Sequence, residues 1–249
     1  MRLTEQQLRF FDTFGYLGFP GLFKDEVDAI TDSYERVWAE HGGGHNNAPH
    51  DHRTRSNLQQ FIEENEYLSS LVDDPRIDGI AASVLGDDYN YSHSDGNRYV
   101  GDTPWHPDLV GRKVVSSFKM GFYLDPVGRE SGCLQVIPGS HKFGDKFAQA
   151  LREAAPSVRG NRTEALWGVR GSDVPAVALE TQPGDMLMFN HQTVHGSFGG
   201  GTGRRMFTVN MEERYREEDL PELRVEMARN PGRSGYDSAY GEAMVRTAT

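Results

Sequence analysis

The sequence of 249 residues contains a single cysteine, Cys133, so the chain cannot form an internal disulfide. Such scarcity is typical of proteins that work in a reducing interior. No stretch approaches the roughly 20 apolar residues of a membrane span, and the first residues lack the apolar run of a signal peptide. The sequence therefore predicts a cytoplasmic protein with no membrane partner.

Positive charge is scarce as well. Lys and Arg number 26 against 37 Asp and Glu, the formal net charge is −11, and no block of Lys and Arg occurs. Proteins that bind nucleic acids or anionic membranes need clustered positive charge. We therefore expect no nucleic-acid partner.

The sequence does contain two regions of different pattern. Up to about residue 87, apolar residues recur at helical spacing, with Thr4 and Asp25 as candidate N-caps. The helices are expected over residues 4–14, from residue 27, over 58–71 and over 75–85. From residue 89, short alternating runs are separated by turns with Pro and Gly. Helices placed before many short strands indicate a mainly β protein, a β-sandwich or jelly roll with flanking helices.

This pattern predicts one domain over residues 1–249. It would comprise a helical part (about 1–87), a β core (about 88–214) and a charged tail (215–249). Strands are expected at 89–93 and 98–100, among others, and a helical insertion at 143–155. The long polar loop at 41–57 is unusual inside a compact domain and is a candidate lid or binding loop. Its histidines are interpreted as solvated.

A His-x-Asp pair, His106 and Asp108, is the first candidate site. In an extended strand residues i and i+2 point to the same face, so an imidazole and a carboxylate would project together. His195 can supply a second imidazole from a distant strand. Two His and one carboxylate on one face of a divalent metal are the ligand set of non-haem Fe(II) oxygenases. His191 is the competing histidine, but its neighbours indicate a turn.

Arg204 and Arg205 begin a later strand and must point to opposite faces. Arg204 shares its face with more polar residues than Arg205 does, which predicts that Arg204 faces the polar interior beside the metal. A buried Arg there needs an anionic partner, and a dicarboxylate co-substrate supplies one through bidentate pairing.

Together these residues resemble the phytanoyl-CoA dioxygenase-like family of Fe(II)/2-oxoglutarate oxygenases. The resemblance covers roughly residues 5–211, and its signatures are Trp105-His106-Pro107-Asp108, Ser131-Gly132-Cys133-Leu134, Ile137-Pro138-Gly139-Ser140-His141, Pro183-Gly184-Asp185, His195-Gly196-Ser197 and Arg204. It implies a cupin-like double-stranded β-helix. It also implies Fe(II) held by His106, Asp108 and His195, with 2-oxoglutarate bound by Arg204 and Ser197.

The resemblance further implies that O₂ and 2-oxoglutarate are consumed and that succinate and CO₂ are released. Because Asp108 is present where related halogenases have Gly or Ala, hydroxylation-type chemistry is favoured; desaturation, epoxidation and ring formation stay open. The substrate is expected to be a small free molecule. Arg53, Arg55 and Arg98 are the candidate substrate residues, because the segment before the barrel lines the pocket in this family.

Two alternatives stay open at this point. A metal cupin enzyme that does not use 2-oxoglutarate would leave Arg204 without an evident role. A catalytically silent jelly-roll binding protein would not need the intact His–Asp–His set. The sequence leaves the oligomeric state open between monomer and homodimer.

Overall fold

The structure is a computed structural model that describes residues 1–109, 116–142, 146 and 168–221. Its helices are α1 (Glu5–Phe14), α2 (Val27–Glu40), α3 (Glu66–Ser70) and α4 (Pro75–Leu85). Its strands are β1 (Tyr16–Phe19), β2 (Ser56–Gln59), β3 (Tyr89–Tyr99), β4 (Thr103–His106), β5 (Ser117–Tyr123), β6 (Leu134–Val136), β7 (Val177–Leu179), β8 (Met186–Asn190), β9 (His195–Ser197) and β10 (Arg204–Glu213). The expected helical insertion at 143–155 and most of the tail lie outside the described residues. None of the described helices is long and apolar enough to cross a membrane.

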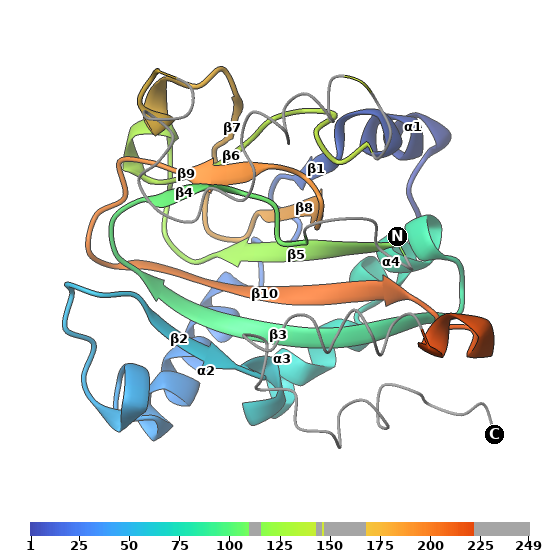
Figure 1. Ribbon diagram of the computed structural model, residues 1–249. Helices are drawn as coiled ribbons and strands as arrows, with labels where there is room; N and C mark the ends of the chain where they lie inside the picture. Colours follow the sequence, from blue (N-terminus) through green and yellow to red (C-terminus); the bar gives the residue numbers. More distant parts are fainter. Residues whose placement is uncertain (110–115, 143–145, 147–167, 222–249) are drawn as a thin grey trace.

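The strands form two antiparallel sheets that face each other (Figure 1). The larger sheet has the order β1-β8-β5-β10-β3-β2, and the smaller has the order β4-β9-β6-β7. Pairing of strands that are distant in sequence, such as β3 with β10, is typical of jelly rolls. The predicted fold class, a mainly β double-stranded β-helix with flanking helices, is confirmed.

Helices α2, α3 and α4 cover the outer face of the larger sheet (Figure 1). Their buried residues pack against alternate side chains of β5 and β10, including Phe118, Met120, Phe122, Phe207 and Val209. Side chains of a strand alternate between faces, so the intervening residues point to the interior between the sheets. The main hydrophobic core therefore lies between the helices and the outer face of the larger sheet. The inner face of this sheet is available for polar groups.

The sequence correctly predicted the start of α1, but it was less accurate for the start of α2 and for residues 56–59. Thr4 and Gln7 form a complete capping box at the start of α1. The predicted cap Asp25 is wrong, since α2 begins after Glu26 and no side chain caps it. Ser56–Gln59 is an edge strand rather than the start of a helix, because its backbone pairs with β3.

The two strands expected at 89–93 and 98–100 are one continuous strand, β3, that passes through Gly96. A Cβ atom on Gly96 would lie 2.1 Å from the ring of Phe61, so only glycine lets the helical layer approach the sheet here. Gly96 is thus a point of close packing within a single strand.

Candidate active site

Strand pairing brings the two predicted histidines together. His106 on β4 and His195 on β9 are direct register partners in the smaller sheet. Asp108 was expected in the same strand as His106, but β4 ends at His106. Asp108 is placed instead by its backbone N–H, which donates to the carbonyl oxygen of His191 at 2.9 Å.

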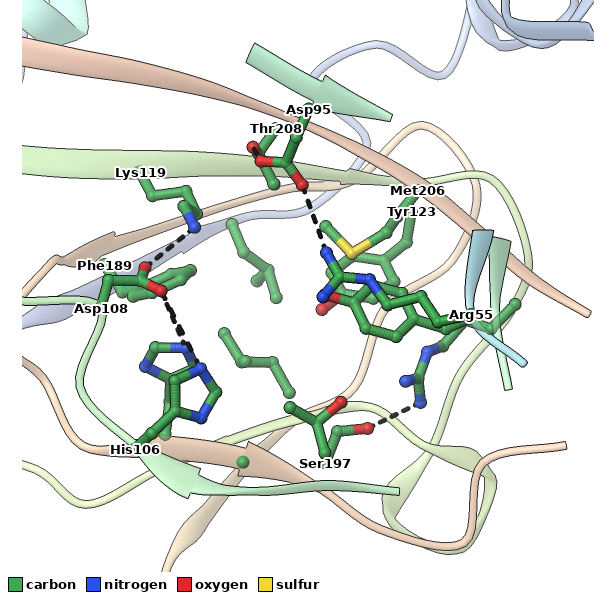
Figure 2. Close-up of a pocket in the computed structure, with 18 residues that line it drawn as sticks. Arg55, Asp95, His106, Asp108, Lys119, Tyr123, Phe189, Ser197, Met206 and Thr208 are labelled. Carbon is green, nitrogen blue, oxygen red and sulfur yellow. Dashed lines mark hydrogen bonds and ion pairs between the residues drawn. The ribbon is translucent and has the colours of Figure 1, made fainter. Parts of the chain in front are cut away.

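The three side chains converge on one point (Figure 2). Oδ1 of Asp108 lies 3.9 Å from Nε2 of His106 and 3.8 Å from Nε2 of His195. These separations are too long for hydrogen bonds, but they are shorter than two metal–ligand bonds of about 2.0–2.2 Å each. The donor set and its spacing therefore fit one divalent metal ion with two nitrogen ligands and one oxygen ligand.

Both imidazoles are oriented for this role by backbone carbonyls. Nδ1 of His106 lies 2.7 Å from the oxygen of Pro104, and Nδ1 of His195 lies 2.8 Å from that of Thr193. Because a carbonyl oxygen can only accept, each Nδ1 carries the proton and Nε2 faces Asp108. Burial, assisted by the nearby His106, lowers the pKa of His195 to about 3, so this imidazole stays neutral.

Neighbouring charge keeps the carboxylate of Asp108 ionised. Burial alone would favour the neutral acid, but the Lys119 ammonium keeps the pKa of Asp108 well below its usual range. Nζ of Lys119 lies 2.9 Å from Oδ2 of Asp108, the oxygen that is not shared by the histidines (Figure 2).

A pocket of about 710 Å³ of empty space, partly open to solvent, joins the His–Asp–His group to Arg204. Arg204 is buried, and its Nη1 donates to the hydroxyl of Ser197 at 2.6 Å and to the carbonyl oxygen of Gly132 at 2.5 Å. Its guanidinium lies 4.8 Å from the ring centre of Tyr99. Among the described residues, no carboxylate forms an ion pair with Arg204. A buried guanidinium in this state can bind an anion.

Gly132 allows Arg204 to occupy this position. Its φ is +87°, and a Cβ atom there would lie 1.8 Å from Nη1 of Arg204. Glycine is therefore required both for the turn and for the close approach of the guanidinium. The Gly132-Cys133 signature of the sequence thus belongs to the end of the pocket that contains Arg204.

Arg205 points to the other face of β10. It pairs with Asp125 at 2.6 Å and with Glu35 of α2 at 2.9 Å, so it joins the sheet to the helical layer. Met206 and Thr208 share the pocket face with Arg204, in agreement with the alternation read from the sequence.

Of the three predicted substrate arginines, the structure brings only Arg55 to the pocket. Arg98 lies on the opposite face of β3, where it pairs with Glu35 at 2.5 Å and stacks near Trp38 of α2. The assignment of Arg98 to the pocket is therefore corrected: residue 98 falls on the outer face of a continuous strand. Arg53 is exposed on the 41–57 loop and does not line the pocket.

Two other histidines, His191 and His141, contact protein groups away from the His–Asp–His group. His191 lies in the turn after β8, between the Ser117 hydroxyl at 2.6 Å and the Asn210 side-chain oxygen at 2.8 Å. It is outside the His–Asp–His group. Nε2 of His141 lies 2.9 Å from the backbone oxygen of Asp12, outside the His–Asp–His group.

Sequence reasoning missed Lys119 and Asp95, which line the pocket from β5 and β3 (Figure 2). Asp95 accepts hydrogen bonds from the side chains of Thr208 and Asn97. The sequence did contain a sign of this role for Lys119, which is the one charged residue in the otherwise apolar run Phe118–Phe122. Because side chains alternate along a strand, Lys119 points to the inner face of the sheet.

Two imidazoles and one carboxylate at one end of a jelly-roll pocket, with a buried arginine at the other, indicate the class of non-haem iron oxygenases. The chain belongs to the phytanoyl-CoA dioxygenase (PhyH) family, whose model matches residues 11–206. A probable phytanoyl-CoA dioxygenase of Caenorhabditis elegans is 29% identical over 99 residues. That alignment covers 39% of this chain and only 30% of the relative's length.

Two solved structures show the same fold. The non-haem α-ketoglutarate-dependent carbocyclase SnoK, from nogalamycin biosynthesis, is 24% identical with a TM-score of 0.64, and the match covers 85% of each chain. HygX from Streptomyces hygroscopicus, solved with nickel and 2-oxoglutarate bound, is 20% identical with a TM-score of 0.65; the match covers 86% of this chain and 89% of HygX.

Proposed function

We propose that the protein is an Fe(II)- and 2-oxoglutarate-dependent oxygenase of the EC 1.14.11 type that oxidises a small molecule. His106, Asp108 and His195 would hold the metal, and Arg204 with Ser197 would bind the distal carboxylate of 2-oxoglutarate. The observation that carries this proposal is a buried arginine in the same pocket as the His–Asp–His group, with no carboxylate partner among the residues that the structure describes. Family membership and the 2-oxoglutarate in the similar HygX structure support it.

When bound, Fe(II) with 2-oxoglutarate and O₂ supplies an oxidant that removes hydrogen from a substrate C–H bond, and succinate and CO₂ are released. The protein orients the imidazoles through the Pro104 and Thr193 carbonyls and keeps His195 neutral. Leu134, Leu187 and Phe189 provide apolar walls that exclude water. Hydroxylation is the favoured outcome; desaturation, epoxidation or ring formation would use the same groups.

Arg55 is the proposed substrate contact. Its Nε donates to the side-chain oxygen of Asn97 at 2.8 Å, and its guanidinium lies 4.3 Å from the centre of the Tyr99 ring. Its carboxylate neighbour, Asp95, is 3.8 Å away, farther than the partners of Arg98 and Arg205. Arg55 is thus held in place at the pocket wall with part of its guanidinium free to bind an anionic group of the substrate.

The experiment is a screen of small metabolites for succinate formation with Fe(II), 2-oxoglutarate and O₂, followed by mass spectrometry of the products. A gain of 16 mass units indicates hydroxylation or epoxidation, and a loss of 2 indicates desaturation or ring formation. Oxygen uptake that does not require 2-oxoglutarate would favour the metal cupin alternative. Failure to bind Fe(II) would favour the silent binding protein. Monomer or homodimer, and the cytoplasmic location, stay predictions.

A further inference from the structure

Lys119 is a cation inside the pocket whose function neither the family match nor the proposed ligands explain. It stands on the inner face of β5 with a side chain only 16% exposed, between the carboxylates of Asp108 and Asp95 (Figure 2). Desolvating a lysine is costly, so its position requires a compensating interaction. The closest acidic oxygen is Oδ2 of Asp108, at 2.9 Å.

We propose that Lys119 is a positioning residue that restricts Asp108 to one metal-binding oxygen. This inference rests on the function proposed above, in which Asp108 is a metal ligand. The two oxygens of Asp108 face different partners: Oδ1 faces the two imidazole Nε2 atoms at 3.8 and 3.9 Å, and Oδ2 faces the Lys119 ammonium. The ion pair therefore holds Oδ2 away from the metal position.

This division matters because of the number of open positions around the metal. A six-coordinate ion held by three protein atoms retains three positions, which suffice for a chelating 2-oxo acid and O₂. A carboxylate that binds through both oxygens would fill one of them. By keeping Oδ2 occupied, Lys119 preserves the full set of open positions.

Lys119 is better explained as the partner of Asp108 than as a counter-ion required by Asp95. Asp95 already accepts hydrogen bonds from Thr208 and Asn97 and has Arg55 at 3.8 Å. In the part of the chain that the structure describes, Lys119 is the only Lys or Arg that forms an ion pair with Asp108. Asp95 then serves as the second charge that keeps the ammonium in the pocket.

The test compares the wild-type protein with Lys119→Met and Lys119→Arg, and uses Lys24→Met, an exposed lysine, as the matched control. Each protein is loaded with Mn(II), and the carboxylate stretching bands of the bound aspartate are read from infrared difference spectra against the metal-free protein. Asp108→Asn identifies the bands. The separation between antisymmetric and symmetric stretches is wide when one oxygen binds and narrow when both bind.

We expect a wide separation in the wild type, Lys119→Arg and Lys24→Met, and a narrow one in Lys119→Met. The dissociation constant for 2-oxoglutarate, followed anaerobically by the charge-transfer absorption of the Fe(II) complex, should rise about tenfold in Lys119→Met. Metal affinity should not fall, whereas general unfolding would lower both affinities. An unchanged separation in Lys119→Met would overturn the inference and leave the oxygenase proposal intact. Absence of the charge-transfer absorption in the wild type would overturn both.

Discussion

His106 and His195 face each other as register partners across β4 and β9, and their ring centres are 4.4 Å apart. Pairing between two short strands therefore sets the distance between the two imidazoles. Any ion bound there depends on both strands and on the turn that places Asp108.

Removal of any member of this group should abolish turnover. We expect His106→Ala, Asp108→Ala and His195→Ala to lose Fe(II) binding while retaining the far-ultraviolet circular dichroism of the wild type, because a three-residue metal site has no spare ligand. Equilibrium dialysis with metal analysis measures the binding. Metal retention in His195→Ala, together with loss in His191→Ala, would show that the wrong distal histidine was assigned.

His191→Ala should instead reduce stability. His191 is buried and hydrogen-bonded to the side chains of Ser117 and Asn210, so its removal leaves both partners unsatisfied. The expected loss in the free energy of unfolding is about 1–3 kcal/mol, measured by urea denaturation. Metal binding should persist because the carbonyl of residue 191, which holds Asp108, belongs to the backbone.

Arg204 and Arg205 should differ sharply in their effect on the co-substrate. Loss of a buried charged pair costs about 2–4 kcal/mol, or roughly 30- to 1,000-fold in affinity. Arg204→Ala should therefore raise the 2-oxoglutarate concentration needed for half-maximal succinate formation by that factor. Arg205→Ala, which loses ion pairs to Asp125 and Glu35 on the outer face, should raise it only slightly. The reverse ranking would contradict the assignment.

Gly132→Ala offers a second test of the proposed binding of 2-oxoglutarate by Arg204. An added Cβ atom would collide with the Arg204 guanidinium, so 2-oxoglutarate binding should weaken. Gly101→Ala is the matched control, because Gly101 also has a positive φ, +67°, but nothing lies within 4 Å of its added Cβ. Gly101→Ala should cost about 1 kcal/mol of stability through backbone strain and leave 2-oxoglutarate affinity unchanged. Equal effects of the two variants on this affinity would argue against the role of Gly132.

Cys133 should be unreactive in the folded protein. It is fully buried, and burial, with the nearby Glu180 carboxylate, raises the pKa of its thiol to about 11. Because the thiolate is the reactive form and is populated only as the pH approaches 11, iodoacetamide at pH 8 should not alkylate the native protein. Mass spectrometry should show one added group only after denaturation. Rapid alkylation of the native protein would contradict the burial of Cys133.

The sequence predicted the parts of the site that depend on local pattern. The alternation along β10 assigned Arg204 and Arg205 to opposite faces, and the turn character of residues 190–192 distinguished His191 from His195. The predictions from sequence failed where pairing between strands distant in sequence determines the local structure. Ser56–Gln59 is a strand only because β3 is beside it, and residue 98 faces outward only because β3 continues through Gly96.

Lys119 and Asp95 could not be assigned to the pocket from the local sequence pattern either. Each is a single charged residue in a strand, and its partner comes from another segment of the chain: Asp108, after the end of β4, for Lys119, and Thr208 of β10 for Asp95. Only the sheet order β5-β10-β3 places these two charges in one pocket. The lid function expected for the 41–57 loop stays a prediction. His52 of this loop contacts the backbone oxygen of Thr202 at 2.8 Å, so the loop lies against the connection between β9 and β10.

The most direct test of the central claim is the binding of 2-oxoglutarate by isothermal titration calorimetry, with and without Mn(II), which binds without supporting turnover. The structure predicts binding to the Mn(II)-loaded wild type, and weak or no binding when the metal is removed or when His195→Ala or Arg204→Ala is used. Affinity for 2-oxoglutarate that is the same with and without metal, or the same in these variants, would contradict the account.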